Sequence, residues 1–219
     1  MKSRLILLLS VLVLASLACQ AIISEASTTS APPADRAEVL FQDNFSNPAS
    51  GWDRLDEPEG VTDYAAGVYR MVVNEADTDI WANPGLDFGD VQIEVDATKV
   101  GGDDNNDFGL ICRYQDTENF YFLIISSDGY YGIGKVVAGD QQLIGTDSMP
   151  PSDAINQGNA HNHLRADCAG KTLRLFANGE LLAEYEDDQF SSGDVGLIAG
   201  TFDSPGTEIH FDNFMVLEP

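Results

Sequence analysis

The sequence predicts an all-β protein, and three observations favour an antiparallel two-sheet sandwich. From Val39 to Pro219, no segment shows a sustained helical periodicity. Short runs that alternate apolar and polar residues, or that are apolar throughout, are separated by clusters of Gly, Asn and Asp. The runs amount to about a dozen strands without crossover helices, which indicates antiparallel pairing.

Each expected strand follows from its own pattern. Residues 91–100 alternate most cleanly between apolar and polar side chains, which is typical of a half-buried strand. Residues 108–114 and 119–125 are apolar on both faces, which predicts central strands. Asn178-Gly179 is the strongest short turn signal, and Ser-Asp-Gly at 127–129 predicts a second tight turn. In chain order the expected strands are 39–45, 67–73, 78–82, 91–100, 108–114, 119–125, 130–137, 141–145, 162–168, two within 171–186, 194–200 and 207–217.

Residues 1–18 have the pattern of an export signal. Lys2 and Arg4 precede an apolar run that is too short for a good membrane span. The run ends in "ASLAC", which resembles the lipobox of bacterial lipoproteins, although Ser16 stands where that family more often has Leu. The resemblance implies cleavage after Ala18 and a lipid on Cys19, which anchors the protein outside the bacterial cell membrane. The alternative is an ordinary secreted protein with an accidental cysteine.

The composition of the segment after the lipobox is typical of a flexible tether. Residues 19–38 are rich in Ser, Thr, Ala and Pro, and such a segment buries too little apolar surface to offset its ordering entropy. We therefore expect a flexible linker over 19–38 and one folded domain over 39–219.

The charge balance limits the possible partners. The chain has 36 acidic and 11 basic residues, a formal net charge of −25. Nucleic acid is excluded as a partner because phosphate binding needs a basic surface. The excess of acidic residues is typical of a protein that stays soluble at a cell surface. A more specific interpretation is that some of these carboxylates bind calcium.

Two cysteines remain once Cys19 carries a lipid. Alternation places Cys112 on the apolar face of 110–114, and Cys168 on the apolar face of 164–168. An oxidising compartment favours a disulfide between them. The alternative is a pair of buried free thiols.

Four segments resemble the concanavalin A-like jelly roll, and the resemblance covers residues 39–217. They are "FQDNFSNPASGW", "FGLICRY…NFYFLIISSDGYYGI", "LRLFANGELLAE" and "GDVGLIAG…HFDNFMV". The "NG" hairpin followed by "GDVGL" is similar to laminin-G-type and lectin-type modules. The whole arrangement also resembles the bacterial domain named for 3-keto-disaccharide hydrolases. This fold hosts lectins, glycosidases and interaction modules, so it does not decide the function.

A catalytic carboxylate motif is broken in this sequence. Jelly-roll glucanases carry an acidic strand of the form Glu-x-Asp-x-x-Glu. Here Glu94 and Asp96 match the first two positions, but Lys99 stands in the third. We expect Glu94 and Asp96 to form the solvated face of a half-buried strand, and the protein to be non-catalytic.

Two places could bind calcium. Asp103–Asp107 offers several oxygen ligands in "DDNND", and the alternative there is a solvated loop. The triplet Asp-Asn-Phe occurs at both 43–45 and 212–214. The jelly-roll resemblance implies a structural calcium near the chain ends, with Asp212 as ligand and Asp43 as the weaker second. The alternative is that these aspartates bond loop amides.

Sugar binding needs exposed aromatic faces with polar groups beside them. The candidates are Trp81, Tyr121, Tyr130 and Tyr131, with Arg113 on the preceding strand as their polar partner. The alternative is that this aromatic hairpin belongs to the core.

The sequence therefore predicts a lipid-anchored, extracytoplasmic binding module whose partner is carbohydrate or another cell-envelope component. The alternatives are a glycoside hydrolase-like enzyme of the 3-keto-disaccharide hydrolase type and a protein-interaction module with no small ligand. The sequence does not name the ligand or the oligomeric state.

Overall fold

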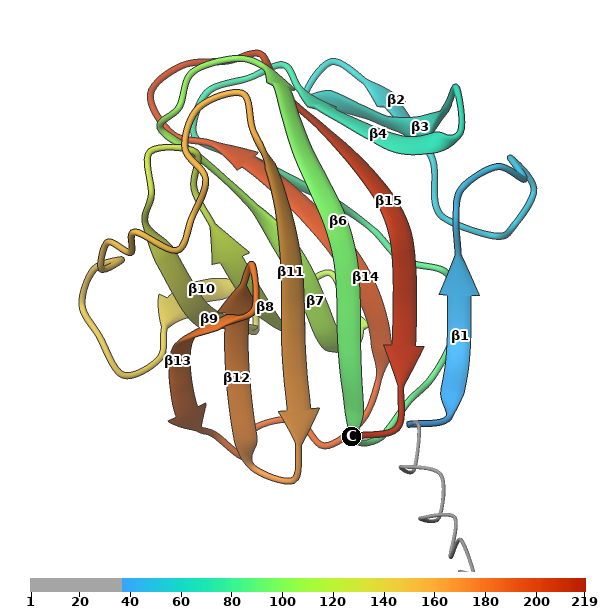
Figure 1. Ribbon diagram of the computed structural model, residues 1–219, viewed down its shortest axis with the longest axis vertical. Helices are drawn as coiled ribbons and strands as arrows, with labels where there is room; N and C mark the ends of the chain where they lie inside the picture. Colours follow the sequence, from blue (N-terminus) through green and yellow to red (C-terminus); the bar gives the residue numbers. More distant parts are fainter. Residues whose placement is uncertain (1–36) are drawn as a thin grey trace, which may run out of the picture. The chain divides into compact units, whose positions relative to one another are not determined.

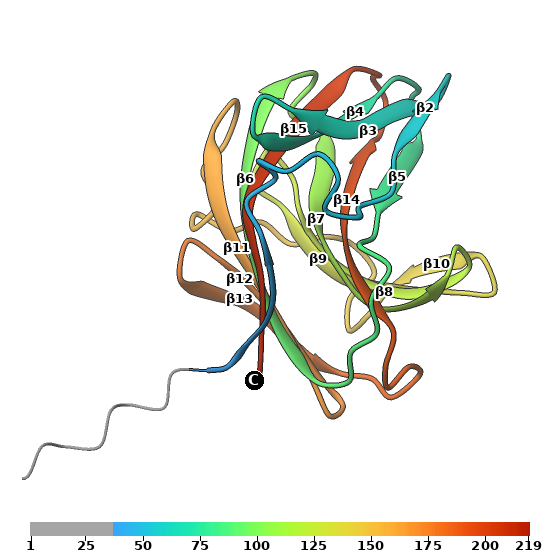
Figure 2. The same ribbon diagram turned by 90° about the vertical axis from the view of Figure 1, so that its right-hand side faces the viewer.

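The computed structural model describes residues 37–219, so the expected export signal, nearly all of the linker and Cys19 lie outside the described residues. The described chain forms two sheets packed face to face, and every strand pairing within it is antiparallel (Figures 1 and 2). No helix in residues 37–219 is long and apolar enough to span a membrane. The predicted antiparallel two-sheet sandwich is confirmed.

Sheet A has nine strands in the order β13-β12-β11-β6-β15-β4-β3-β2, with β1 paired to β15. The first and last strands thus lie side by side (Figure 1). The strands of sheet A are β1 (Val39–Asp43), β2 (Leu55–Glu57), β3 (Gly60–Ala65), β4 (Val68–Val73), β6 (Val91–Gly101), β11 (His161–Ala169), β12 (Thr172–Ala177), β13 (Glu180–Glu186) and β15 (Thr207–Leu217).

Sheet B has six strands in the order β10-β9-β8-β7-β14-β5. Strands β5 and β10 form the two edges of this sheet, and both lie on the right-hand side of Figure 2, with β5 above β10. The strands of sheet B are β5 (Thr78–Ala82), β7 (Asn106–Asp116), β8 (Asn119–Ile125), β9 (Tyr131–Val137), β10 (Asp140–Leu143) and β14 (Asp194–Thr201).

The sequence did not predict β2 and β3. The residues that β3 buries are Gly60 and Thr62, so this strand lacks the apolar alternation that identifies a strand. The Asn178-Gly179 hairpin between β12 and β13 is confirmed. Both residues have positive φ, 51° and 87°, as a two-residue hairpin turn of the primed type requires.

Strand β8 is buried on both faces. Tyr121, Leu123 and Ile125 point into the main core between the sheets. Phe120, Phe122 and Ile124 alternate with them and join a second apolar cluster on the outer face of sheet B, with Ile111, Val136 and Ile198. The prediction of a central strand, apolar on both faces, is confirmed.

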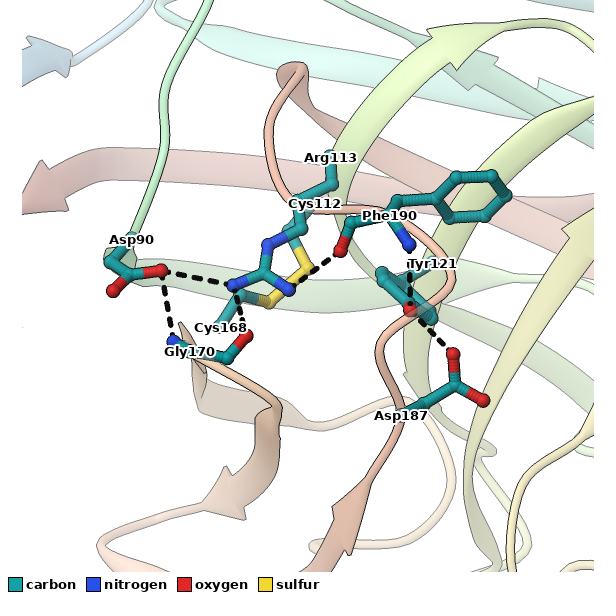
Figure 3. Close-up of a disulfide and its surroundings, with 8 residues drawn as sticks. All are labelled: Asp90, Cys112, Arg113, Tyr121, Cys168, Gly170, Asp187 and Phe190. Atoms are coloured by element: carbon teal, nitrogen blue, oxygen red, sulfur yellow. Dashed lines mark hydrogen bonds and ion pairs between the residues drawn. A yellow bond between two sulfur atoms is a disulfide. The ribbon is translucent and has the colours of Figure 1, made fainter.

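The predicted disulfide is confirmed as well. Cys112 of β7 bonds to Cys168 of β11, and both residues are fully buried (Figure 3). The bond joins sheet B to sheet A across the core and closes a loop with a sequence separation of 56 residues.

Loss of this bond should lower the free energy of unfolding by roughly 4 kcal/mol, because the cross-link removes loop-closure entropy from the unfolded chain. Urea denaturation of a Cys112→Ala/Cys168→Ala variant, beside the oxidised wild type, measures the change. The wild type under reducing conditions is the matched control and should shift by a similar amount. Equal unfolding free energies in all three samples would contradict the expectation.

Candidate functional site

The outer face of sheet B contains a groove. Two cavities of about 380 and 260 Å³ adjoin there and share Asp77, Asp79, Phe122 and Gln141. Asp79 belongs to β5 and Gln141 to β10, the two opposite edges of the sheet, so the sheet curves until its edges face each other. We call this region the sheet B groove; its lining is Asp77, Thr78, Asp79, Trp81, Asp107, Thr117, Phe120, Phe122, Ile124, Val136, Gly139, Gln141, Gln142, Leu143, Met149, Ile198, Thr201 and Phe202.

Strand alternation places the side chains of the groove. Ile80 and Ala82 of β5 enter the main core, which turns Asp79 and Trp81 outward. Phe108 of β7 likewise points inward, so the preceding Asp107 points outward.

Two carboxylates converge over one glycine. Gly200 of β14 pairs with Asp79 on one side and with Asp107 on the other, so the three residues form a row across three strands. A methyl group built on Gly200 would lie 2.0 Å from Asp79 Oδ1 and 2.7 Å from Asp107 Oδ2. Only glycine leaves room for both carboxylates at this position.

Burial makes ionisation of this pair costly. Loss of hydration raises the pKa of Asp79 to about 6, although the Gln141 side chain opposes the shift. Burial also raises the pKa of Asp107, and the charge of Asp79 raises it further. The Asp107 side chain is only 4 % exposed, and its Oδ1 has no hydrogen-bond partner among the described residues.

No cationic side chain of the described chain compensates the pair. Residues 37–219 contain eight Lys and Arg residues, and each of them pairs with a different carboxylate. The three histidines pair with Glu94, Asp96 and Glu208 of sheet A. The groove is therefore acidic without an internal counter-ion.

Aromatic rings line the groove beside the acids. Trp81 is half-buried and packs on Phe120 with the ring centroids 5.4 Å apart. Tyr114 also packs on Phe120, with the ring centroids 5.6 Å apart. Phe122 lines both cavities and lies over Gly134 of β9, where any larger residue would collide with the ring.

The structure separates the predicted sugar-binding residues. Trp81 lines the groove, and Tyr130, 41 % exposed, lines an adjoining cavity of about 580 Å³ that shares Met149 and Phe202 with it. Tyr131 instead packs half-buried against the main core.

Arg113 and Tyr121 lie inside the molecule, so their prediction as groove residues is wrong. Arg113 is 1 % exposed, and its guanidinium donates to the carbonyls of Phe190 and Gly170, at 2.8 and 2.9 Å, and to Asp90 (Figure 3). Its φ of 54° lies in a β-bulge, which reverses the face that alternation predicts.

Tyr121 is fully buried next to this network. Its hydroxyl donates to Asp187 and accepts from the Phe190 backbone N–H at 3.1 Å (Figure 3). The alternative interpretation, that the aromatic hairpin is core, therefore holds for Tyr121.

The carboxylate of Asp43, a predicted calcium ligand, is engaged within the chain. It already accepts hydrogen bonds from the Phe45 N–H, the Ser50 hydroxyl and the Trp52 indole N–H. Asp212 accepts the N–H of Asn213, its neighbour in sequence. No three His, Cys, Asp or Glu side chains within residues 37–219 are grouped as metal ligands. Calcium binding at the chain ends stays a prediction.

The acidic strand of the broken glucanase motif faces away from the groove. Glu94 and Asp96 lie half-buried on the outer face of sheet A, where His163 bonds to Asp96 at 2.9 Å. Lys99 points the opposite way, is buried, and pairs with Asp104 at 2.6 Å. Glu94 and Asp96 thus form a surface ion-pair network with His161 and His163, and Lys99 is not part of it.

Sequence reasoning missed Asp79 and Gln141, and it included Asp107 only as the last residue of the candidate calcium segment Asp103–Asp107. One signal was present for Asp79, because it stands two residues before Trp81 and so shares its face. The sequence pattern places Asp107 at the end of a polar loop, but β7 begins at Asn106, so Asp107 belongs to the strand.

No protein-family model matches this chain, and no curated protein matches it. Solved structures do resemble it. A carbohydrate-binding module from Bacillus subtilis has a TM-score of 0.62 at 20 % identity, covering 77 % of this chain and 96 % of its own. A Bacillus subtilis protein of unknown function with a galectin-like fold has a TM-score of 0.62 at 11 % identity, covering 84 % and 97 %. A Bacillus licheniformis beta-glucanase has a TM-score of 0.58 at 9 % identity, covering 82 % and 98 %. These likenesses confirm the concanavalin A-like jelly-roll fold.

The carboxylate pair should make stability fall as pH rises. A carboxyl group whose pKa is raised on folding stabilises the folded state below its unfolded pKa, and this contribution is lost as pH rises through the folded value, about 6 for Asp79. In metal-free buffer, Asp79→Asn should therefore gain stability relative to wild type between pH 4 and pH 7, by on the order of 2 kcal/mol. Urea denaturation at each pH measures the difference, with exposed Asp56→Asn as control. A difference that does not change with pH would contradict the prediction.

Proposed function

We propose that this chain is a carbohydrate-binding module held outside a bacterial cell membrane by a lipid on Cys19, with the sheet B groove as its ligand site. The observation that carries the proposal is the composition of the groove, where the rings of Trp81 and Phe122 line a cavity together with Asp79, and Phe122 and Asp79 line the adjoining cavity together with Asp107. Aromatic faces bind the apolar side of a sugar ring, and carboxylate oxygens accept its hydroxyls.

The comparisons support the same ligand class. By name, two of the similar structures are a carbohydrate-binding module and a beta-glucanase. Anionic ligands are disfavoured because the groove holds three aspartates and the chain has a net charge of −25. A neutral glycan fits these properties.

Replacing Trp81 by Ala should weaken glycan binding by about tenfold, because a stacking surface is lost from the groove. A polysaccharide and glycan-array screen on the purified protein identifies the ligand, and calorimetry then compares the two proteins. Phe176→Ala is the matched control, since Phe176 is a half-buried aromatic residue on β12 in the opposite sheet.

Two results would contradict the proposal. Equal losses in Trp81→Ala and Phe176→Ala would place the ligand elsewhere or reflect a loss of folding. A complete lack of glycan binding by the wild type would favour the interaction-module alternative.

A second candidate function, glycoside hydrolysis of the 3-keto-disaccharide hydrolase type, is favoured by the carboxylate pair. A carboxyl group with a raised pKa can serve as general acid while a second carboxylate acts as base or nucleophile. Release of reducing ends from a bound glycan by the wild type, and its loss in Asp79→Asn, would decide for this function over binding alone.

Replacing Cys19 by Ala should release the protein from the membrane, because the thiol that carries the lipid is removed. Fractionation of a bacterial host followed by immunoblotting measures the distribution. Ser16→Leu is the matched control, since it improves the lipobox and should keep the protein in the membrane fraction. A Cys19→Ala protein that stays in the membrane fraction would show that another feature anchors the chain.

A further inference from the structure

We propose that Asp79 and Asp107 form a binding site for a divalent cation of the calcium type at the floor of the sheet B groove. This site differs from the pair at the chain ends, Asp43 and Asp212. It goes beyond glycan binding and does not depend on it.

The geometry brings the necessary oxygens together. The Asp79 and Asp107 carboxylates reach over Gly200 from the two neighbouring strands, and both line the same cavity of about 380 Å³. A cation between them would contact oxygens of both side chains. The absence of a side chain at Gly200 leaves the room for this.

Asp107 provides a second, independent observation. Its side chain is 96 % buried, yet it lines the cavity, and Oδ1 finds no donor within residues 37–219. Buried carboxylates normally bind N–H or O–H groups, as Asp43 does with three donors. A buried carboxylate that lines a cavity and has an oxygen without a donor indicates a ligand from outside the described chain.

The charge balance favours a cation over a neutral donor. A buried carboxylate beside a half-buried one is unfavourable without a counter-ion, and the eight Lys and Arg side chains of the described region are all engaged elsewhere. A divalent ion would neutralise both charges at once.

The donor chemistry selects the class of ion. The cavity offers carboxylate oxygens and the side-chain amides of Gln141 and Gln142, and its lining contains no His or Cys. Oxygen-only ligands suit calcium, while zinc and copper prefer nitrogen and sulfur. Because the cavity is open to the groove, water or ligand hydroxyls can complete the coordination.

The other acidic loop is already satisfied. Asp103 accepts the Asn105 N–H at 3.0 Å, and Asp104 pairs with Lys99. Within the segment 103–107, only Asp107 reaches the groove. This contrast makes Asp103→Asn a matched control, since it removes one acid from the same segment.

Terbium luminescence on the chelator-treated full chain, purified in detergent, tests the site directly. Trp81 lines a cavity together with Asp79 and can sensitise a bound terbium ion. We expect saturable luminescence that calcium displaces, and a calcium-dependent rise in melting temperature. Asp107→Asn and Gly200→Ala should weaken terbium binding by at least about tenfold, while Asp103→Asn and Gly89→Ala should leave it unchanged. Gly89 is a suitable control because a methyl group there meets no atom within 4 Å.

Three results would overturn the proposal. They are no saturable terbium or calcium binding by the wild type, full binding by Asp107→Asn, and a loss of binding in Asp212→Asn alone, which would place the ion at the chain ends. If Asp107→Asn does not fold by near-ultraviolet circular dichroism, Asp79→Asn replaces it in the same comparison.

Discussion

The apolar character of both faces of β8 is the constraint on which the rest of the structure depends. Its inner side chains pack in the main core against sheet A, while Phe120, Phe122 and Ile124 need cover on the other side. The curvature of sheet B brings β5 and β10 toward each other over this second cluster, since Asp79 and Gln141 line the same cavities. The groove is thus a consequence of how the sheet shields its own apolar outer face.

A second constraint lies in the latter half of β7, where a disulfide and a buried arginine link the strand to its surroundings. Cys112 binds sheet A covalently, and the next residue, Arg113, holds the carbonyls of Gly170 and Phe190 (Figure 3). Burying a guanidinium is costly unless its N–H groups are engaged; here Nη1 and Nη2 donate to two loop carbonyls and Asp90, while Nε has no partner within residues 37–219. The covalent and polar links therefore fix the same corner of the sandwich.

Alternation predicted which faces are buried, because this property is local. It placed both cysteines correctly in the core. It failed at Arg113, because the bulge that reverses its side chain is set by pairing with β14 and β8 and not by its neighbours in sequence. The Asp79–Asp107 pair could not be predicted for a related reason. It depends on the register of β5, β14 and β7 together, and these strands are far apart in the sequence.

The groove also shows where the chain departs from what stability alone favours. An apolar residue in place of Asp107 would avoid the cost of a desolvated carboxylate, and a larger residue in place of Gly200 would stiffen β14. The chain has neither, and the two departures adjoin. A buried acid alone could be incidental. Here, however, the Asp107 carboxylate has an oxygen without a donor and lies beside a second carboxylate, that of Asp79. Gly200, between them, is the residue small enough to admit both. This arrangement is consistent with a ligand bound between the two carboxylates. Functional sites are the places where such conflicts with local stability are expected.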